Sequence, residues 1–184
     1  LKIYFDNDKP EKSNNNTLSH EDYKFYYNNY LNMRNKFTEV YSSDLEGKFK
    51  INAIRNMNYF FDTEIIQGKI SLDRLLIEIE SLLKDGKKIK LIFKGFSSPL
   101  TSHEYNKQLS KRRINSVEKY IRNYNQEIFK NYFTNNKIQI IMMPFGEELA
   151  PKFINDDPKD IKNSIFSISA SRERRVEIIK IEID

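Results

Sequence analysis

The stretch Glu104-Tyr-Asn-Lys-Gln-Leu-Ser-Lys-Arg-Arg-Ile-Asn-Ser-Val117 carries more information than any other part of the chain. As a helix, it places Leu109 and Val117 on one apolar stripe. Arg113 lies four residues from each and shares that stripe, and Asn106 lies two turns earlier on the same line. A guanidinium beside an apolar face is costly unless an anion or a carbonyl satisfies it. Spacing alone leaves two interpretations open, a structural ion pair with an acid of the sheet or a site for a ligand carboxylate.

Around this helix, the apolar patterns alternate between the periods of strands and of helices. They predict a half-buried strand over Leu1–Asp6, an Asn-rich loop over Ser13–Thr17 and a helix over residues 20–44 with a core-facing tyrosine stripe. A second helix over residues 49–66 is expected to stop at Gly68, and Ser71 is expected to cap a third, which Asp85-Gly86 ends. The remaining expected elements are a strand from Ile89 that ends at Gly95, a helix over 103–123, a strand over Ile138–Met143, an irregular polar segment over 147–170 and a strand over Arg174–Ile183.

This order predicts an α+β two-layer sandwich, with a mixed sheet of about four strands and helices packed on one face. The last strand has a fault in its alternation, because Ile178 and Ile179 are adjacent apolar residues. A β-bulge explains the fault, as does a central strand that is covered on both faces. No repeat or long linker divides the chain, so residues 1–184 are expected to form a single domain.

Composition excludes several classes of site. The 184 residues include no cysteine, which rules out disulfide scaffolds, Cys-ligated zinc and cysteine nucleophiles. Two histidines argue against a multi-histidine metal centre, and the five glycines form neither a P-loop nor a GxGxxG pattern. The 13 Phe and 11 Tyr supply the bulk for a core. We therefore expect no metal and no cofactor.

Charge and hydropathy limit the kinds of partner that the chain is expected to have. The 31 basic and 26 acidic residues give a net charge of +5, which is modest and scattered, so nucleic-acid binding is not favoured. No apolar run is long enough to span a bilayer, and no signal peptide opens the chain. Because the first residue is Leu, we expect an excised or processed piece whose anchor or targeting segment lies elsewhere.

Four segments, in order, resemble the OmpA-like C-terminal domain, the peptidoglycan-binding module of outer-membrane porins, of the peptidoglycan-associated lipoprotein and of flagellar stator proteins. Ile-Tyr-Phe5-Asp6 is similar to the opening strand of that family, and Lys94-Gly95-Phe96-Ser97 to the strand end that introduces the binding loop. The helix from Glu104 to Arg113 is similar to the family's signature helix, and Arg174-Arg175-Val-Glu-Ile178 to its final strand. The resemblance covers residues 1–10 and roughly 70–184, and it implies a β/α/β/α/β-β arrangement.

The resemblance also implies a function without catalysis. The family grips the diaminopimelate residue of the peptidoglycan stem peptide, and its helix arginine, carried over to Arg113, holds the ligand carboxylate. Asn106 and Leu109 carry over as lining residues and Asp6 as the aspartate after the first strand, while Arg112 is expected to face solvent. The matching segments add Phe5, Ser97 and Arg174 to the expected binding residues, although a sheet-edge ion pair is the favoured role for at least one of Arg174 and Arg175. The implied place is the periplasm, with attachment to the outer membrane through a part of the protein not present here.

Two departures separate this chain from that family. Ser98 stands where the family has the aspartate that receives the ligand ammonium, so either Asp6 or Glu104 takes the ammonium, or the ligand differs, or binding is weak or lost. Asp6 and Gly95 are 89 positions apart, which makes residues 15–68 an insertion, expected to form two helices. Extended versions of this kind resemble envelope proteins of bacteria with type IX secretion. The alternative function is a protein-interaction domain of an envelope or secretion complex that has lost wall binding and docks a partner through the inserted helices.

Other chemistry finds little support in the sequence. Gly95-Phe-Ser97-Ser-Pro lacks the second glycine of a nucleophile elbow. His103 is expected to be a surface or cap residue. Asp156, Asp157 and Asp160 lack EF-hand spacing and are expected to form a solvated turn. The chain is therefore not expected to be an enzyme.

Overall fold

The structure is a computed structural model that describes residues 1–11 and 18–184, so the predicted Asn-rich loop over Ser13–Thr17 lies outside the described residues. The elements, in chain order, are β1 (Lys2–Tyr4), α1 (Tyr23–Asn32), α2 (Arg34–Tyr41), α3 (Gly47–Phe60), the π-helical turn η1 (Phe61–Ile66), α4 (Gln67–Lys84), β2 (Ile89–Phe96), α5 (His103–Arg122), α6 (Tyr124–Glu127), α7 (Lys130–Thr134), β3 (Ile138–Gly146), α8 (Ile161–Ser164), α9 (Ile168–Glu173) and β4 (Arg175–Ile183).

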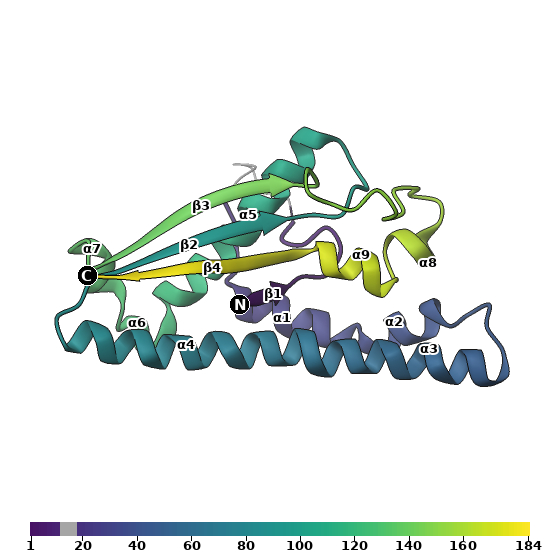
Figure 1. The fold of residues 1–184 in the computed structure, drawn as a ribbon, viewed down its shortest axis with the longest axis horizontal. Helices are drawn as coiled ribbons and strands as arrows, with labels where there is room; N and C mark the ends of the chain where they lie inside the picture. The colour runs from purple at the N-terminus through teal and green to yellow at the C-terminus, as the bar shows by residue number, and fades with distance from the viewer. Residues whose placement is uncertain (12–17) are drawn as a thin grey trace.

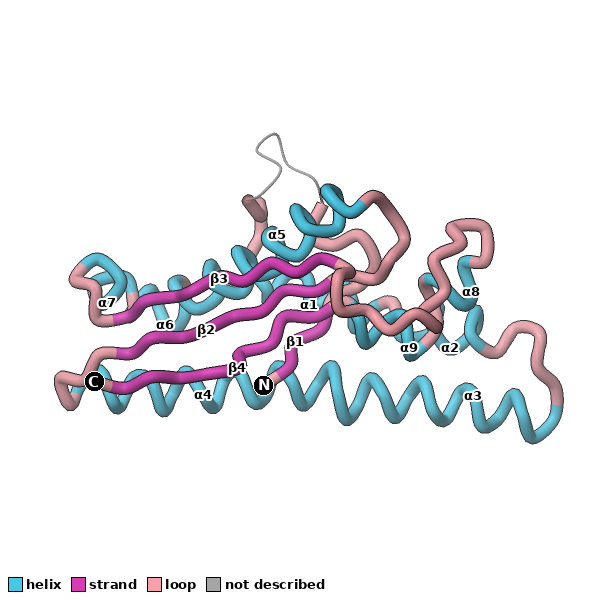
Figure 2. Tube along the Cα trace, turned by 45° about the horizontal axis from the view of Figure 1, so that its top comes forward, coloured by secondary structure: helices cyan, strands magenta, loops and turns pink. Residues whose placement is uncertain are grey.

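The strands form one mixed sheet in the order β1-β4-β2-β3 (Figure 1). β2 and β3 run parallel, whereas β4 is antiparallel to both β2 and β1. Figure 2 shows the sheet in front and α1, α4 and α5 behind it. The main core lies between these layers, where Leu91 and Phe93 of β2 meet Leu76 of α4 and Val117 of α5. The predicted α+β two-layer sandwich with a mixed four-stranded sheet is confirmed.

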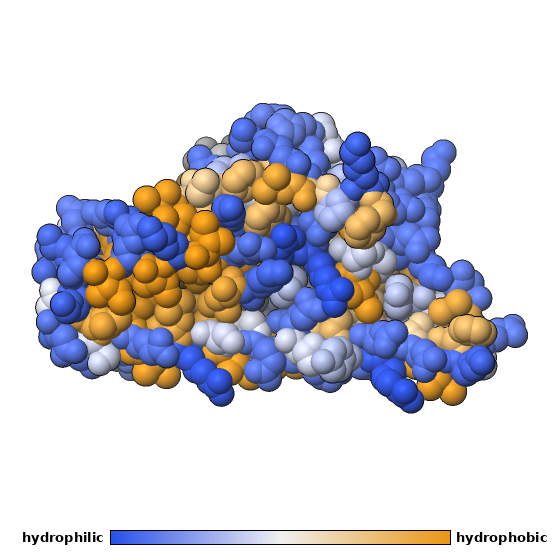
Figure 3. All heavy atoms as spheres, in the orientation of Figure 1, coloured by the Kyte–Doolittle hydropathy of each residue, from blue (hydrophilic) through white to orange (hydrophobic). Residues whose placement is uncertain are grey.

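The fault in the last strand is a β-bulge. Ile92 pairs with Lys180 while Phe93 pairs with Ile178, so Ile179 is the extra residue. The competing explanation, cover on both faces, is wrong for this segment, because Ile179 and Ile181 are exposed. Figure 3 shows apolar residues gathered on this side of the molecule over the strands. The exposed apolar side chains of β3 and β4 include Ile141, Met143, Ile179, Ile181 and Ile183.

The predicted boundary between the second and third helices is wrong. α3, η1 and α4 follow one another without a break from Gly47 to Lys84, and Ser71 lies inside α4 rather than at its cap (Figure 1). Gly68 has a different role from the predicted stop. A Cβ atom on Gly68 would lie 2.5 Å from the carbonyl oxygen of Lys2. The glycine therefore lets the helix approach the backbone of β1, a contact that local sequence patterns do not encode.

The helices between β1 and α4 build a second core. The helix predicted over residues 20–44 starts at Tyr23, with Asp22 as its N-cap, and is divided at Met33 into α1 and α2. Its tyrosine stripe is core, as expected: Tyr23, Tyr30 and Phe37 are fully buried. The second core consists of Tyr4, Tyr30, Phe37, Met57, Phe60, Phe61, Ile65 and Phe166. Burial of each such side chain contributes about 1.5–3 kcal/mol, so the inserted helices are part of the fold.

Tyr4 joins the second core to the sheet. Its ring packs edge-on against Phe60 at 5.6 Å, and its hydroxyl donates a hydrogen bond of 2.7 Å to Glu64. Ile3, the neighbouring residue, lies in the main core. β1 is therefore covered on both faces, and the prediction of a half-buried first strand is wrong because the inserted helices cover its second face.

The segment over residues 147–170 is less irregular than predicted, since it contains α8 and the start of α9. Asp160 caps α8 by accepting a hydrogen bond from the backbone N–H of Asn163, and Ser167 caps α9. Asp156 and Asp157 are exposed, and the described residues contain no group of side chains that could hold a metal ion. None of the described helices is long and apolar enough to cross a bilayer.

Candidate functional site

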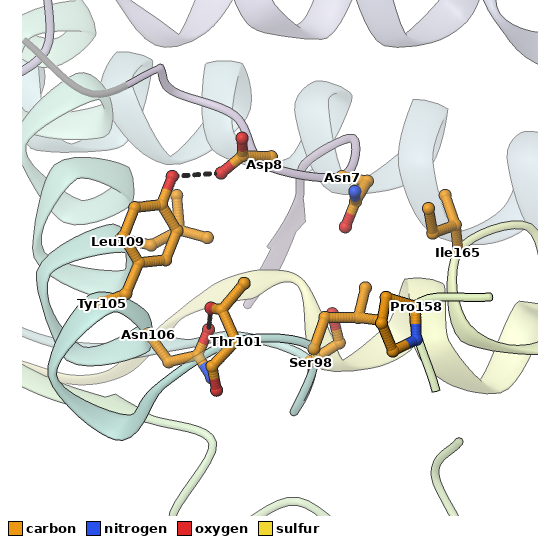
Figure 4. A pocket seen from close by; sticks show the side chains of 10 residues that line it. Asn7, Asp8, Ser98, Thr101, Tyr105, Asn106, Leu109, Pro158 and Ile165 are labelled. Atoms are coloured by element: carbon orange, nitrogen blue, oxygen red, sulfur yellow. Dashed lines mark hydrogen bonds between the residues drawn. The ribbon is translucent and has the colours of Figure 1, made fainter. Parts of the chain in front are cut away.

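A pocket of about 180 Å³ lies where the loops after β1 and β2 meet the start of α5 (Figure 4). The first loop contributes Asn7 and Asp8, and the second contributes Ser98, Leu100 and Thr101. The other wall residues are Tyr105, Asn106 and Leu109 of α5, with Pro158 and Ile165. Three residues expected at the site, Ser98, Asn106 and Leu109, therefore lie in one cavity.

Asn106 fixes the loop that follows β2. Its side-chain amide donates a hydrogen bond of 3.0 Å to the carbonyl of Thr101, and its side-chain oxygen accepts one of 2.7 Å from the Thr101 hydroxyl. Ser102 caps α5 through the backbone N–H of Tyr105. Because both ends of this loop are held, Ser98 is presented to the pocket from a fixed backbone.

Arg113 lies below the pocket rather than in its wall. Its guanidinium is fully buried, 5.5 Å from the ring of Phe5, which is also fully buried. Its donors meet three main-chain carbonyls: that of Phe96 at 2.7 Å, that of Lys9 at 2.9 Å and that of Asp6 at 3.4 Å. Burial lowers the pKa of Arg113, and the nearby Arg174 adds to this effect. The sequence left two possible partners for this guanidinium, an acid of the sheet or a ligand carboxylate. In the structure its hydrogen-bond partners are backbone carbonyls.

Arg112 does not face solvent, so that expectation is wrong. It is fully buried, its Nε donates a hydrogen bond of 3.0 Å to the carbonyl of Pro10, and its guanidinium lies 5.2 Å from the ring of Tyr105. Arg112 follows Leu109 by three residues, so helical periodicity places the two on the same side of α5. The segment after β1 folds over that side and covers it.

The other expected residues lie around the pocket but not in its wall. Asp6 is partly buried, and burial raises the pKa of its carboxyl, against the opposing effect of Arg174. Ser97 is buried, and its backbone N–H donates to the carbonyl of Gly146 at 2.8 Å. Glu104 is exposed and accepts a hydrogen bond from Gln108.

Arg174 is fully buried behind β1. Its Nη2 donates to the carbonyl of Ile165 at 2.8 Å and to the hydroxyl of Ser171 at 2.7 Å. Among the described residues, its Nε and Nη1 find no hydrogen-bond partner. Its own carbonyl accepts a hydrogen bond of 2.8 Å from the N–H of Phe5. Arg174 thus holds the start of β4 against β1, whereas Arg175 forms ion pairs with Glu173 and Glu177 on a strand that lies between β1 and β2 and not at the sheet edge.

Sequence reasoning missed Asp8 and Tyr105. Asp8 has a positive φ of 52°, which turns its side chain toward α5, and the Tyr105 hydroxyl donates a hydrogen bond to its carboxylate (Figure 4). Of the residues that line the pocket, Asp8 alone carries a formal charge. The signal that could have found it is the Asp-Asn-Asp run directly after the first strand, which contains a second acid two residues after Asp6.

His103 lies outside the pocket, as expected for a surface residue. Its side chain is exposed at the start of α5, with Nδ1 3.2 Å from Glu147.

Comparisons with known proteins identify no relative. No family model matches the chain, and neither a curated protein nor a solved structure matches it.

Proposed function

We propose that this domain binds the diaminopimelate side chain of a peptidoglycan stem peptide without covalent chemistry and thereby anchors an outer-membrane protein to the cell wall from the periplasm. The observation that carries the proposal is the convergence of Ser98, Asn106 and Leu109 on one pocket with Asp8. The first three of these positions came from the resemblance to the OmpA-like family, and they lie on two separate elements.

The chemistry of the pocket favours an aliphatic chain that ends in an ammonium group. Leu100, Leu109, Pro158 and Ile165 offer apolar contact, and a volume of about 180 Å³ suits a side chain better than a sugar ring. Asp8 supplies a carboxylate at the wall. In this proposal Asp8 takes the ammonium that an acid at the position of Ser98 takes in the related domains.

Arg113 is the proposed partner of the ligand carboxylate, but only one of its bonds is open to exchange. The bond from Nη2 to the carbonyl of Asp6 is the longest of the three, at 3.4 Å, against 2.7 and 2.9 Å for the others. A ligand carboxylate that replaces this carbonyl needs a small shift of the backbone after β1. A charge-assisted bond to a carboxylate is stronger than one to a neutral carbonyl, which favours the exchange.

The test is sedimentation of the domain with purified peptidoglycan sacculi, together with titration of a diaminopimelate-containing fragment. Asp8→Asn should weaken binding of the fragment by roughly tenfold, because a charge-assisted bond contributes about 1.5–3 kcal/mol, and less where water screens it. Asp85→Asn, an equal change at an exposed aspartate beyond the end of α4, is the matched control. The proposal fails if the unaltered domain does not sediment with sacculi.

The alternative proposal, a domain that docks an envelope protein, has an observation of its own. α3 exposes Phe49, Ile51 and Tyr59, while its other face packs in the second core. In cells, a photoreactive residue in place of Tyr59 should form a cross-link to an envelope protein, whereas one in place of Asp85 should not. A domain that does not bind sacculi and forms no cross-link from position 59 would contradict this alternative. A cross-link formed at Tyr59 and absent at Asp85 would support it.

A further inference from the structure

The outer edge of β4 is only partly covered. β1 pairs with Arg175, Val176 and Glu177, and Leu1 extends this pairing by one residue through two hydrogen bonds with Ile178, of 2.9 and 3.1 Å. Beyond Ile178, no described strand pairs with β4 on this side. Figure 1 shows β4 continuing well past the start of β1.

The hydrogen-bond pattern on the inner side shows which backbone groups point outward. Lys88 and Asp184 exchange two bonds, of 2.9 and 3.0 Å. In an antiparallel pair such positions alternate, so Ile181 and Ile183, which stand opposite Leu91 and Ile89, direct their N–H and C=O groups away from β2. Their side chains are 38% and 50% exposed. Natural edge strands are commonly short, charged or covered, and this edge leaves two isoleucines open.

A groove lies beside this edge. It has a volume of about 370 Å³, with Ser71 and Leu75 of α4 on one wall and Ile179 and Ile181 of β4 on the other. Leu1 closes one end of it. β1 occupies the equivalent position between β4 and the long helix, so a strand in the groove would continue the line of β1.

Charge at the same edge favours an acidic partner. Lys180 and Glu182 stand opposite Ile92 and Lys90 on the open face of the sheet. Glu182 accepts hydrogen bonds of 2.7 Å from both Lys180 and Lys90, and these bonds lower its pKa to about 2. The Lys180 side chain is 60% exposed, so its ammonium can also contact an acidic residue of a partner strand.

We propose that the edge of β4 from Lys180 to Ile183 binds an extended peptide of a partner protein, which adds to the sheet antiparallel to β4. The register of this pairing with β4 determines which peptide sequence the edge would accept. Apolar residues stand opposite Ile183 and Ile181 and enter the groove, any residue stands opposite Glu182, and an acidic residue stands opposite Lys180. The recognised pattern, read from the N-terminus, is apolar, any, apolar, acidic. This site is separate from the pocket of the proposed function.

The test uses fluorescence polarisation with a labelled short peptide built on Val-Thr-Val-Glu and a matched peptide that ends in Lys instead of Glu. The unaltered protein should prefer the acidic peptide by about fivefold, the effect of one cross-strand charge pair. Lys180→Glu should reverse this preference. Ile181→Pro should weaken binding by about tenfold, because it removes an outward N–H and leaves the pairing with β2 intact.

Circular dichroism establishes that each variant is folded, and the reversal in Lys180→Glu keeps the test decisive if Ile181→Pro does not fold. No binding of the acidic peptide at concentrations up to about 1 mM overturns the proposal, as does an equal affinity for the two peptides. Sedimentation velocity adds one further outcome. Self-association that Lys180→Glu abolishes would assign the edge to a second copy of the chain and would also overturn the proposal.

Discussion

Replacement of Arg113 by alanine should destabilise the domain before it affects any ligand. The guanidinium is fully buried and donates to the carbonyls of Lys9, Phe96 and Asp6, which come from the segment after β1 and from the end of β2. Arg113→Ala leaves these three acceptors without their donor. Each buried acceptor left without a donor costs about 1–3 kcal/mol, so the three together, toward the low end of that range, cost about 3–5 kcal/mol, a large share of the roughly 5–15 kcal/mol that a domain has in total.

Urea unfolding followed by circular dichroism measures this cost. With a slope of about 2 kcal/mol/M, the unfolding midpoint of Arg113→Ala should fall by about 2 M. Arg113→Lys should fall in between, because an ammonium keeps the charge but cannot donate in the directions of a planar fork. Lys111→Ala, an exposed change on the same helix, should stay within about 0.5 kcal/mol of the unaltered protein.

One result would refute this reasoning. If Arg113→Ala unfolds at the same urea concentration as the unaltered protein and nevertheless loses sedimentation with sacculi, the guanidinium acts on the ligand and not on the backbone. The three carbonyl contacts would then contribute nothing to the fold.

Three further predictions test other parts of the structure. Ser98→Asp should add a second carboxylate to the pocket beside Asp8 and strengthen binding of a diaminopimelate fragment, by up to about tenfold at low salt and less as salt rises, which calorimetric titration measures; an unchanged affinity would show that an acid at position 98 does not reach the ammonium. Gly68→Ala should destabilise the domain by about 1–3 kcal/mol in thermal unfolding, because its Cβ would lie 2.5 Å from the carbonyl of Lys2, and this outweighs the gain in helix propensity. Burial raises the pKa of Asp6, so the folded state holds this proton more tightly than the unfolded state, and stability should fall as pH rises through the native pKa of Asp6; Asp6→Asn should remove this decrease in urea titrations between about pH 3 and pH 7, and an identical pH profile would contradict it.

The sequence predicted those parts of the fold that depend on local patterns. The helix over 103–123, the sheet strands and the fault in alternation at Ile178 and Ile179 all depend on periodicities that neighbouring residues determine, although the choice of a bulge over a strand covered on both faces needed the structure. The break at Gly68 was wrong for a reason of tertiary origin. Gly68, followed three residues later by Ser71, suggests a helix end and a new start, whereas the close approach of β1 explains the glycine inside a continuous helix.

The residues of the site also fall into those that sequence patterns predicted and those that depend on tertiary contacts. Ser98, Asn106 and Leu109 were found because a motif with fixed spacing contains them, and they do lie in one cavity. The prediction that Arg112 faces solvent was wrong, because the chain that covers it comes from residues near Pro10, far from α5 in the sequence. Asp8 depends on a positive φ in a loop, and apolar periodicity carries no signal for such a turn.

The continuous helix from Gly47 to Lys84 bears on how the domain unfolds. Its 38 residues extend roughly 57 Å at 1.5 Å per residue, and they contribute Met57, Phe60 and Ile65 to one core and Leu72, Leu76 and Ile79 to the other. The π-helical turn η1 still packs in the second core through Phe61 and Ile65, and the helix enters the main core after it. Neither half can lose its packing without fraying a helix on which the other half depends. Amide hydrogens of α3 and of α4 should therefore exchange with solvent in one cooperative opening, so that the inserted helices and the sheet unfold as a single unit.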